Sequence, residues 1–238
     1  MNTELLDLYT DYLISSFSQT TATGLSRLFD GVITHDYITN FLAESHLTSK
    51  ELWKLVKKDV RMIESEEGVI IFDDTIQEKP YSDENEIVCY HWDHTVSRSV
   101  KGVNLLNCLY HSQGVNLPLG FDIIRKDEFF VDPKDGKTKR RSRLTKNELM
   151  RAQLKQQQRN QILYRYVLTD IWFSSAENMS FIKKELKKDF IMAIKSNRQL
   201  ALSLEDKLQG NFSSRNRYRY EKTKPFRIMS KDSTFQSF

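Results

Sequence analysis

The chain has 238 residues, of which 39% are hydrophobic and 29% charged, with a net charge of +4 and only 8 Gly and 4 Pro. This composition is typical of a globular protein with a sizeable core, and it excludes collagen-like and low-complexity disordered chains. No apolar run approaches the roughly 18 residues of a membrane span and no basic segment typical of a secretory signal opens the chain, so we expect a cytoplasmic protein that does not bind membranes.

Residues 1–65 are expected to form several short helices. Apolar residues recur at helical spacing in three stretches, 5–13, 25–29 and 38–42. Gly31 is a predicted helix end, Thr34 a predicted helix start, and Thr48 with Glu51 a predicted capping box. Short helices with tight connections are compatible with a helix-turn-helix-like DNA-binding bundle, although small helical bundles have many other uses.

Residues 66–200 are expected to form a mixed α/β core. Apolar runs at 68–72, 103–110, 115–124, 164–168 and 190–194 predict strands, and the short break at Gly114 predicts a hairpin. Residues 132–143 are expected to be a polar, basic turn. A long helix from about 146 to 163 is expected to turn Leu149, Met150 and Leu154 inward, and Ser174 with Glu177 is a predicted capping box for a second helix. After Arg198 the apolar pattern weakens, and the last 28 residues, from Asn211, are polar and basic and form no complete unit.

Positive charge is concentrated in two segments. Residues 134–159 contain ten basic and two acidic residues, and residues 215–231 contain seven basic residues and one acidic residue. Clustered positive charge indicates a polyanionic partner, with nucleic acid the first candidate. A solvated helix face or a flexible tail is the alternative interpretation.

Two aspartates stand where apolar strands are predicted to end. Asp74 follows the first strand and Asp170 the fourth. If these strands are neighbours, both carboxylates emerge at one edge of the sheet, where open α/β sheets hold their sites. Paired carboxylates suit Mg²⁺ or Mn²⁺, and two such ions can promote phosphodiester cleavage. The alternative is that each Asp forms a turn or a helix cap, and Asp73 competes with Asp74 because neighbouring strand residues point to opposite faces.

A second cluster, Cys89, His91 and His94, raises the possibility of zinc. Structural zinc sites use four ligands, typically as two separated pairs, and no second pair with suitable spacing follows. Hydrogen bonding around the first hairpin is therefore the favoured interpretation. Cys89 and Cys108, the two cysteines of the chain, are expected to be reduced thiols. No Walker A, Gly-x-Gly-x-x-Gly or Gly-x-Ser-x-Gly motif is present, which argues against common nucleotide-binding and hydrolase designs.

Several segments, taken together and in order, resemble bacterial insertion-sequence transposases of the DDE superfamily. The segment Ile-Ile-Phe-Asp-Asp-Thr-Ile-Gln-Glu-Lys-Pro-Tyr (70–81) resembles the first catalytic-aspartate block, and 91–94 and 101–106 are similar to the segments that follow it in one branch of these enzymes. Residues 166–173 resemble the second-aspartate block, and 190–198 the strand and basic turn after it. The resemblance spans roughly residues 65–210.

The resemblance implies an N-terminal helical bundle followed by a ribonuclease H-like mixed sheet flanked by helices. It also implies an Asp-Asp-Glu triad that holds Mg²⁺ or Mn²⁺, and double-stranded DNA, at transposon ends and target, as the partner of a monomer or a homodimer. By position in the motifs, Asp74 and Asp170 match the two catalytic, metal-binding aspartates, with Asp73 the less favoured neighbour. The candidate DNA-binding residues are Lys195 and Arg198 from the motif, and Lys146, Arg151, Lys155 and Arg159 from the basic helix.

The sequence departs from the family in one respect. The family's glutamate lies in a block of the form Tyr-x-x-Arg-x-x-x-Glu-x-x-x-x-x-x-Lys, and no Tyr of this chain has Arg and Glu at those positions; Glu205 and Glu221 stand in other contexts. In this family a β-rich insertion precedes the glutamate block, and the resemblance implies that residues 201–238 are the incomplete start of that insertion. We therefore expect the N-terminal part of a longer transposase, with little or no strand-transfer activity and exposed apolar surface on one face of the sheet. A non-catalytic DNA-binding protein that occupies element ends or inhibits the full-length enzyme is the main alternative, and a two-aspartate nuclease of another kind is a further one.

Overall fold

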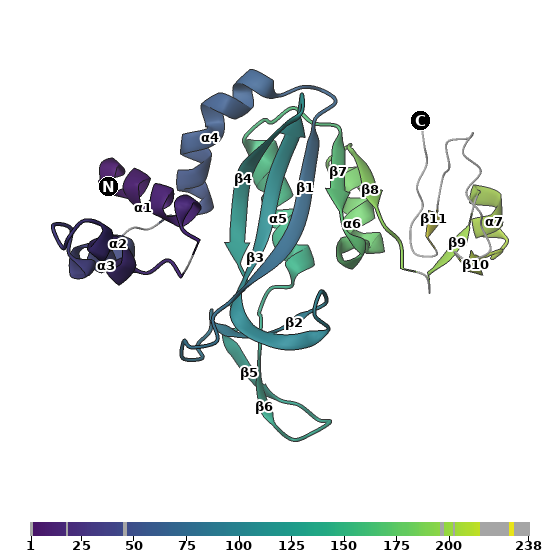
Figure 1. The fold of residues 1–238 in the computed structure, drawn as a ribbon. Helices are drawn as coiled ribbons and strands as arrows, with labels where there is room; N and C mark the ends of the chain where they lie inside the picture. The colour runs from purple at the N-terminus through teal and green to yellow at the C-terminus, as the bar shows by residue number, and fades with distance from the viewer. Residues whose placement is uncertain are drawn as a thin grey trace. The chain divides into compact units, whose positions relative to one another are not determined.

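The computed structural model describes residues 2–17, 19–44, 47–195, 198–201, 203–214 and 229–230. The chain divides into two compact units, Met1–Thr48 and Ser49–Phe238, whose elements are labelled in Figure 1. No helix in the described part of the chain is both long enough and apolar enough to span a membrane.

The first unit is a small bundle of three helices, α1 (Thr3–Ser15), α2 (Ala22–Leu28) and α3 (His35–Glu44). Each begins where a short polar side chain accepts a backbone N–H of the first turn: the caps are Asn2, Thr21 and Thr34. Tyr12, Leu25 and Ile38, one from each helix, form its buried core. The helix start predicted at Thr34 is confirmed, and Gly31 takes the positive φ of +76° that ends a helical segment.

Helix α4 (Ser49–Ile63) belongs to the second unit, so the helical region predicted to reach residue 65 divides at Thr48 instead. The reason is its packing on the sheet. Val60 is fully buried in the main core, and the Ser49 hydroxyl accepts the backbone N–H of Phe121 at 2.7 Å and donates to the Phe121 carbonyl oxygen at 2.5 Å.

The second unit is built on a mixed sheet. Its strands are β1 (Val69–Glu78), β2 (Cys89–Asp93), β3 (Arg98–Ser112), β4 (Val115–Ile123), β7 (Tyr166–Thr169) and β8 (Asp189–Met192), in the order β2-β3-β1-β7-β8, with β4 also paired to β3. Strand β1 is antiparallel to β3 and parallel to β7, and β7 is parallel to β8. The long β3 pairs with β2 through its first part and with β4 through its second.

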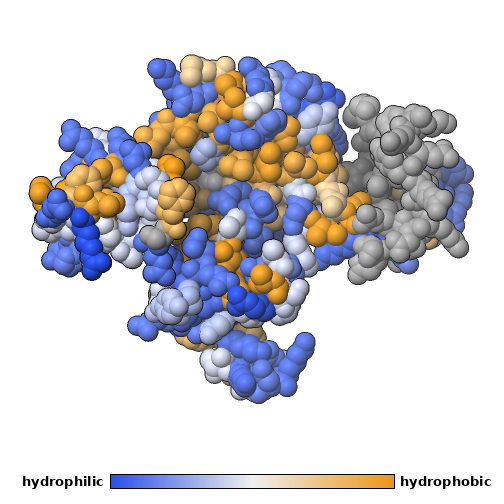
Figure 2. All heavy atoms as spheres, viewed as in Figure 1, coloured by the Kyte–Doolittle hydropathy of each residue, from blue (hydrophilic) through white to orange (hydrophobic). Residues whose placement is uncertain are grey.

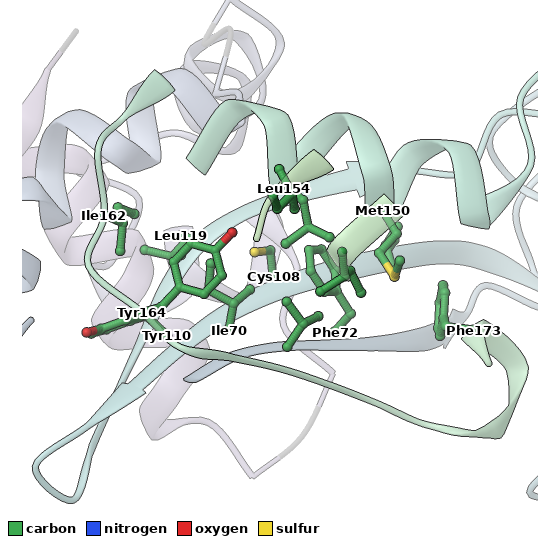
Figure 3. Close-up of a cluster of buried hydrophobic side chains, with 14 of the residues drawn as sticks. Ile70, Phe72, Cys108, Tyr110, Leu119, Met150, Leu154, Ile162, Tyr164 and Phe173 are labelled. Carbon is green, nitrogen blue, oxygen red and sulfur yellow. The ribbon is translucent and has the colours of Figure 1, made fainter. Parts of the chain in front are cut away.

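Helix α5 (Lys146–Arg159) covers one face of this sheet, behind it in the view of Figure 1. Figure 3 shows Met150 and Leu154 pointing from α5 into side chains of the sheet that include Phe72 and Cys108. Met150 and Leu154 are fully buried, as predicted from the helical spacing. Burial of each such side chain contributes roughly 1.5–3 kcal/mol. The predicted fold class, a mixed sheet flanked by helices, is confirmed.

The other face of the sheet is less covered. Along β1, Ile70 and Phe72 are buried while their neighbours Val69 and Ile71 are only partly buried, and Ile191 of β8 is 53% exposed. Figure 2 shows apolar residues on the surface over this part of the molecule. The expected apolar surface on one sheet face is therefore present in the described part of the chain.

Two local predictions were wrong. Residues 132–143 are not simply a turn, because β5 (Glu128–Val131) and β6 (Thr138–Arg141) pair as an antiparallel hairpin; its basic side chains bind acidic ones, as in the Arg141–Glu128 pair at 3.0 Å. The second predicted helix is a short α6 (Ala176–Ser180) followed by one π-helical segment, η2 (Phe181–Glu185), and its cap is Ser175 rather than Ser174.

The 3-10 segment η1 (Ile171–Phe173) lies between β7 and α6. The described elements after β8 are the short helix α7 (Leu204–Leu208) and the strands β9 (Gln199–Ala201), β10 (Ser213–Ser214) and β11 (Met229–Ser230), which pair as a three-stranded antiparallel sheet. Much of the region 201–238, predicted to begin a β-rich insertion, lies outside the described residues.

Candidate active site

Asp74 lies within β1 rather than at its end. The strand continues to Glu78 and pairs with β3 throughout, with Asp74 opposite Leu106. The parallel pairing with β7 stops earlier, at Phe72 and Thr169. The prediction that Asp74 ends a strand is therefore corrected: Asp74 stands two residues beyond the point where β1 loses its β7 neighbour, because the antiparallel β3 continues to pair with β1 there.

Asp170 directly follows β7 on the neighbouring strand. Its carboxylate caps η1, since Oδ1 accepts the backbone N–H of Trp172 at 2.9 Å. Burial raises the pKa of Asp170, the Trp172 N–H lowers it, and the negative charges of Asp74 and Asp73 raise it further. Adjacent strands are about 4.8 Å apart, so the register brings the acidic residues of β1 and Asp170 to the same edge of the sheet, as the sequence predicted.

Asp73 and Asp74 differ in their surroundings. Asp74 accepts a hydrogen bond from Lys146 Nζ at 2.5 Å, and the two side chains are 20% and 35% exposed. Because Lys146 belongs to α5, Asp74 faces the helix-covered side of the sheet, and alternation turns Asp73 to the opposite side. Asp73 is exposed, and its Oδ1 accepts the backbone N–H of Asp74 at 2.9 Å.

A buried amide network holds the segment after Asp170 against α5. Asn178 is fully buried. Its Nδ2 donates to the Phe173 carbonyl oxygen at 2.8 Å and to Asn147 Oδ1 at 2.9 Å, and its Oδ1 accepts from Arg151 Nη1 at 2.6 Å. A buried amide that makes all these bonds fixes the geometry of the groups around it. Sequence reasoning missed Asn178, because nothing in the local pattern distinguishes it from a surface Asn.

The predicted DNA-binding residues do not form one surface. Lys146 is paired with Asp74, and Arg151 is turned inward to Asn178 and to Glu177, the latter at 3.0 Å. Arg159 is exposed and donates to Gln156 Oε1, one helix length of about 20 Å from Lys146.

The other three lie elsewhere. Lys155 Nζ lies 5.3 Å from the ring centroid of Phe181, and Lys195 Nζ lies 4.4 Å from that of Trp172. Arg198 is exposed. Of the six residues, Lys146 and Lys195 therefore have contacts that connect them to the two aspartates, Lys146 directly and Lys195 through Trp172.

A family model described as DDE superfamily endonuclease matches residues 2–233. The chain belongs to this family. Among solved structures, it is similar to "Crystal structure of the Mos1 mariner paired end complex with Mn", with 11% sequence identity and a TM-score of 0.25 over 80% of this chain and 58% of that chain. The chain thus spans 58% of the length of that structure, and a TM-score this low supports no transfer of residues. No curated protein matches the sequence.

The Cys89 and His91 side chains form a buried pair, with Sγ and Nε2 3.3 Å apart. Burial, together with the positive charges of Lys126 and Lys146, lowers the pKa of His91 to about 4. Burial also raises the pKa of the Cys89 thiol. The contact between Cys89 and His91 is the kind of hydrogen bonding that the sequence favoured for this segment. Within the described residues no group of three or more His, Cys, Asp and Glu side chains is placed to hold a metal ion.

The two carboxylates at the sheet edge are ligands of the type that a hard divalent cation binds. Asp74 and Asp170 supply carboxylate oxygens, which Mg²⁺ and Mn²⁺ prefer, and the pKa of Asp170 is raised mainly by burial and further by the charges of Asp74 and Asp73. A third acidic ligand does not join them among the described residues. Glu205 lies in α7, and Glu221 lies outside the described residues.

Proposed function

We propose that this DDE endonuclease is a DNA transposase that cuts and joins phosphodiester bonds at the ends of an insertion sequence, with Asp74 and Asp170 as its metal-binding, catalytic carboxylates. The observation that carries the proposal is the register of the parallel strands β1 and β7, which places Asp74 two residues beyond the last β7-paired residue of β1 and Asp170 directly after β7. The negative charge of Asp74 also contributes to the raised pKa of Asp170, after the larger effect of burial. Asp74 is favoured over Asp73 because it faces α5 and is partly buried.

A bound Mg²⁺ or Mn²⁺ would supply Lewis-acid activation of water and stabilisation of a leaving oxygen. The side chains of the chain itself have other tasks. Asp74 and Asp170 hold negative charge at fixed positions, because β1 is paired on β3 and Asp170 is fixed by the Trp172 N–H. Lys146 balances the charge of Asp74 and, released from it, lies in a position to neutralise a DNA phosphate.

We propose further that this chain is weakly active or inactive on its own, as a truncated copy would be. The glutamate block of the family has no counterpart in the sequence. Two carboxylates bind two divalent ions more weakly than three carboxylates do. Little or no strand transfer is the expected result.

DNA is the proposed partner, held through phosphate contacts of Lys195, Arg198, Lys155 and Arg159, which are not turned into the core as Arg151 is. Phosphate-dominated binding weakens steeply as salt rises. A homodimer is proposed as the active state, and light scattering with and without DNA tests it.

The catalytic proposal is tested with duplex DNA that carries the element ends, in Mn²⁺ and in Mg²⁺. Weak nicking that disappears in Asp74→Asn and Asp170→Asn but persists in Asp73→Asn is expected. Nicking lost in Asp73→Asn and kept in Asp74→Asn would overturn the assignment of the ligand. Efficient, Asp74-dependent joining would overturn the proposal of low activity.

The second candidate function is a non-catalytic DNA-binding protein that occupies element ends or inhibits an intact transposase. The pairing of Lys146 with Asp74 favours it, because a neutralised carboxylate without a third acidic neighbour is a stable arrangement in itself. Salt-sensitive binding to the ends with no cleavage in either metal is the result that this function requires.

A further inference from the structure

An exposed group of rings and one lysine lies next to Asp170. Trp92, near the end of β2, and His94, in the turn that follows, lie beside Trp172 of η1 and Lys195, which follows β8; we call these four residues the aromatic cluster. The His94 ring stacks on Trp172 with centroids 3.9 Å apart and 20° between the planes. Lys195 Nζ lies 4.4 Å from the Trp172 centroid. Trp92 and Trp172 remain 55% and 45% exposed.

His94 contacts the N–H edge of the Trp92 ring. Its Nε1 donates to His94 Nδ1 at 3.1 Å, and the two rings are 69° apart with centroids separated by 6.2 Å. A contact made through the N–H edge leaves both faces of the indole uncovered by the imidazole. The ring of Trp92 is thus held in orientation by His94 while its faces are free of that contact and the residue stays 55% exposed, as a stacking platform requires.

A second exposed ring lies on the same side of β2. Cys89 and His91 are buried, and alternation therefore turns Tyr90 and Trp92 outward, where Tyr90 is 55% exposed. Two residues along a strand are about 7 Å apart, so the two rings can be reached by successive bases of an extended single strand. Lys101, opposite Tyr90 in the β2–β3 ladder, adds positive charge beside them.

The aromatic cluster is connected to the proposed catalytic carboxylate of Asp170 through a backbone hydrogen bond. The N–H of Trp172 donates to Asp170 Oδ1 at 2.9 Å, so a ligand that contacts the cluster lies on the Asp170 side of the sheet edge. Exposed aromatic groups that are held rigidly mark binding surfaces more often than packing defects, and rings combined with lysines are typical of sites for unpaired nucleotides.

We propose that the aromatic cluster binds unpaired nucleotides of a DNA strand beside the sheet edge, with a base stacked on Trp92 and a phosphate neutralised by Lys195. The inference rests on the proposed DNA function and adds a strand-separated substrate to it. Paired bases present only their edges to a protein, so a face-on platform such as Trp92 discriminates for single-stranded or frayed DNA.

The test measures binding of fluorescein-labelled dT12, and of the dT12·dA12 duplex, to the full chain by anisotropy, without divalent metal. Trp92→Ala is expected to weaken dT12 binding about 10-fold, the effect of losing one stacked base, and to leave duplex binding within about twofold. Trp92→Phe should retain most of the affinity, since an aromatic ring face remains on which a base can stack. Tyr81→Ala is the matched control, because Tyr81 is 92% exposed and outside the cluster.

Intrinsic fluorescence gives an independent readout. In a Trp53→Phe background the two remaining tryptophans, Trp92 and Trp172, both belong to the cluster, and dT12 should quench their emission in proportion to binding. Lys195→Gln should reduce the slope of log K against log salt by about 0.7, the value for one phosphate contact to a single strand. Thermal melting by circular dichroism verifies that each variant is folded.

The proposal is overturned if dT12 does not bind, if Trp92→Ala binds dT12 as tightly as Tyr81→Ala does, or if Trp92→Ala weakens duplex and single-strand binding equally. Because no metal is present, these outcomes are independent of cleavage. If the chain binds dT12 but does not cleave DNA, only the catalytic proposal is contradicted. If the chain cleaves DNA but binds dT12 equally well with and without Trp92, only the proposed role of the aromatic cluster is contradicted.

Discussion

The ion pair between Lys146 and Asp74 predicts that replacement of Lys146 by Met will strengthen divalent metal binding. Lys146 Nζ lies 2.5 Å from Asp74 Oδ2, so this cation occupies the carboxylate that a metal ion would use. A metal ion must therefore displace Lys146 before it binds. Met keeps the length and apolar contacts of the side chain and removes the competing charge.

The magnitude follows from the burial of the pair. Two unit charges about 4 Å apart attract by about 4 kcal/mol at the effective dielectric constant of a partly buried site. The side chains are 35% and 20% exposed, so desolvation and lost side-chain freedom cancel much of this attraction, and roughly 1–2 kcal/mol remains. Removal of the competitor should then tighten Mn²⁺ binding about 5- to 30-fold.

Isothermal titration of the chain with MnCl₂ measures this effect directly and needs no DNA. Lys146→Arg keeps the charge and is expected to bind Mn²⁺ as the wild type does, while Asp74→Asn should abolish most of the binding in both backgrounds. Unchanged or weaker Mn²⁺ affinity in Lys146→Met would refute the reasoning, since Lys146 would then not compete with the metal ion.

Three further predictions concern stability. The pKa of His91 is lowered from 6.5 to about 4, so between these pH values the folded state binds fewer protons than the unfolded state. The free energy of unfolding should therefore fall as pH falls through that window, by about 3 kcal/mol at pH 4. Urea unfolding of His91→Gln should lack this part of the loss, and an identical pH profile for both proteins would contradict the prediction. Tyr110→Phe removes a hydroxyl that accepts from the Ser65 N–H at 2.9 Å and donates to the Leu163 carbonyl at 2.8 Å, and should cost about 1–3 kcal/mol in chemical denaturation; a neutral result would mean that water replaces the hydroxyl. Met150→Ala, at a fully buried position, should cost about 2–5 kcal/mol, and a loss below 1 kcal/mol would show that the core collapses around the cavity.

The main features of the core could be predicted from local patterns. The apolar run at 68–72 indicates a strand with buried neighbours, and the spacing of Met150 and Leu154 identifies the inner face of α5, because burial of these side chains is what stabilises both elements. The two aspartates could be found because each follows an apolar run of the sequence, although β1 continues past Asp74. Their proximity could be inferred only through the assumption of adjacent strands, which β1 and β7 satisfy.

Features that depend on distant contacts could not be predicted. Strand β2 has buried Cys89 and His91 alternating with exposed rings, a pattern that also looks like a metal-binding segment when its partner strand is unknown. Lys146 was assigned to a DNA-facing surface, but it pairs with an aspartate 72 positions away. Likewise, the stacking of His94 on Trp172 joins segments whose local sequences say nothing about each other.

The continuity of β3 fixes where β2 lies relative to β1. Residues 98–102 pair with β2 and residues 102–111 pair with β1 in one unbroken strand, and Gly102 faces both Cys89 and Glu78. A Cβ at Gly102 would come within 2.3 Å of the Gln77 carbonyl oxygen, so any other residue at this position would force the two backbones apart. The place of the exposed rings of β2 therefore depends on the lack of a side chain at one position of the neighbouring strand.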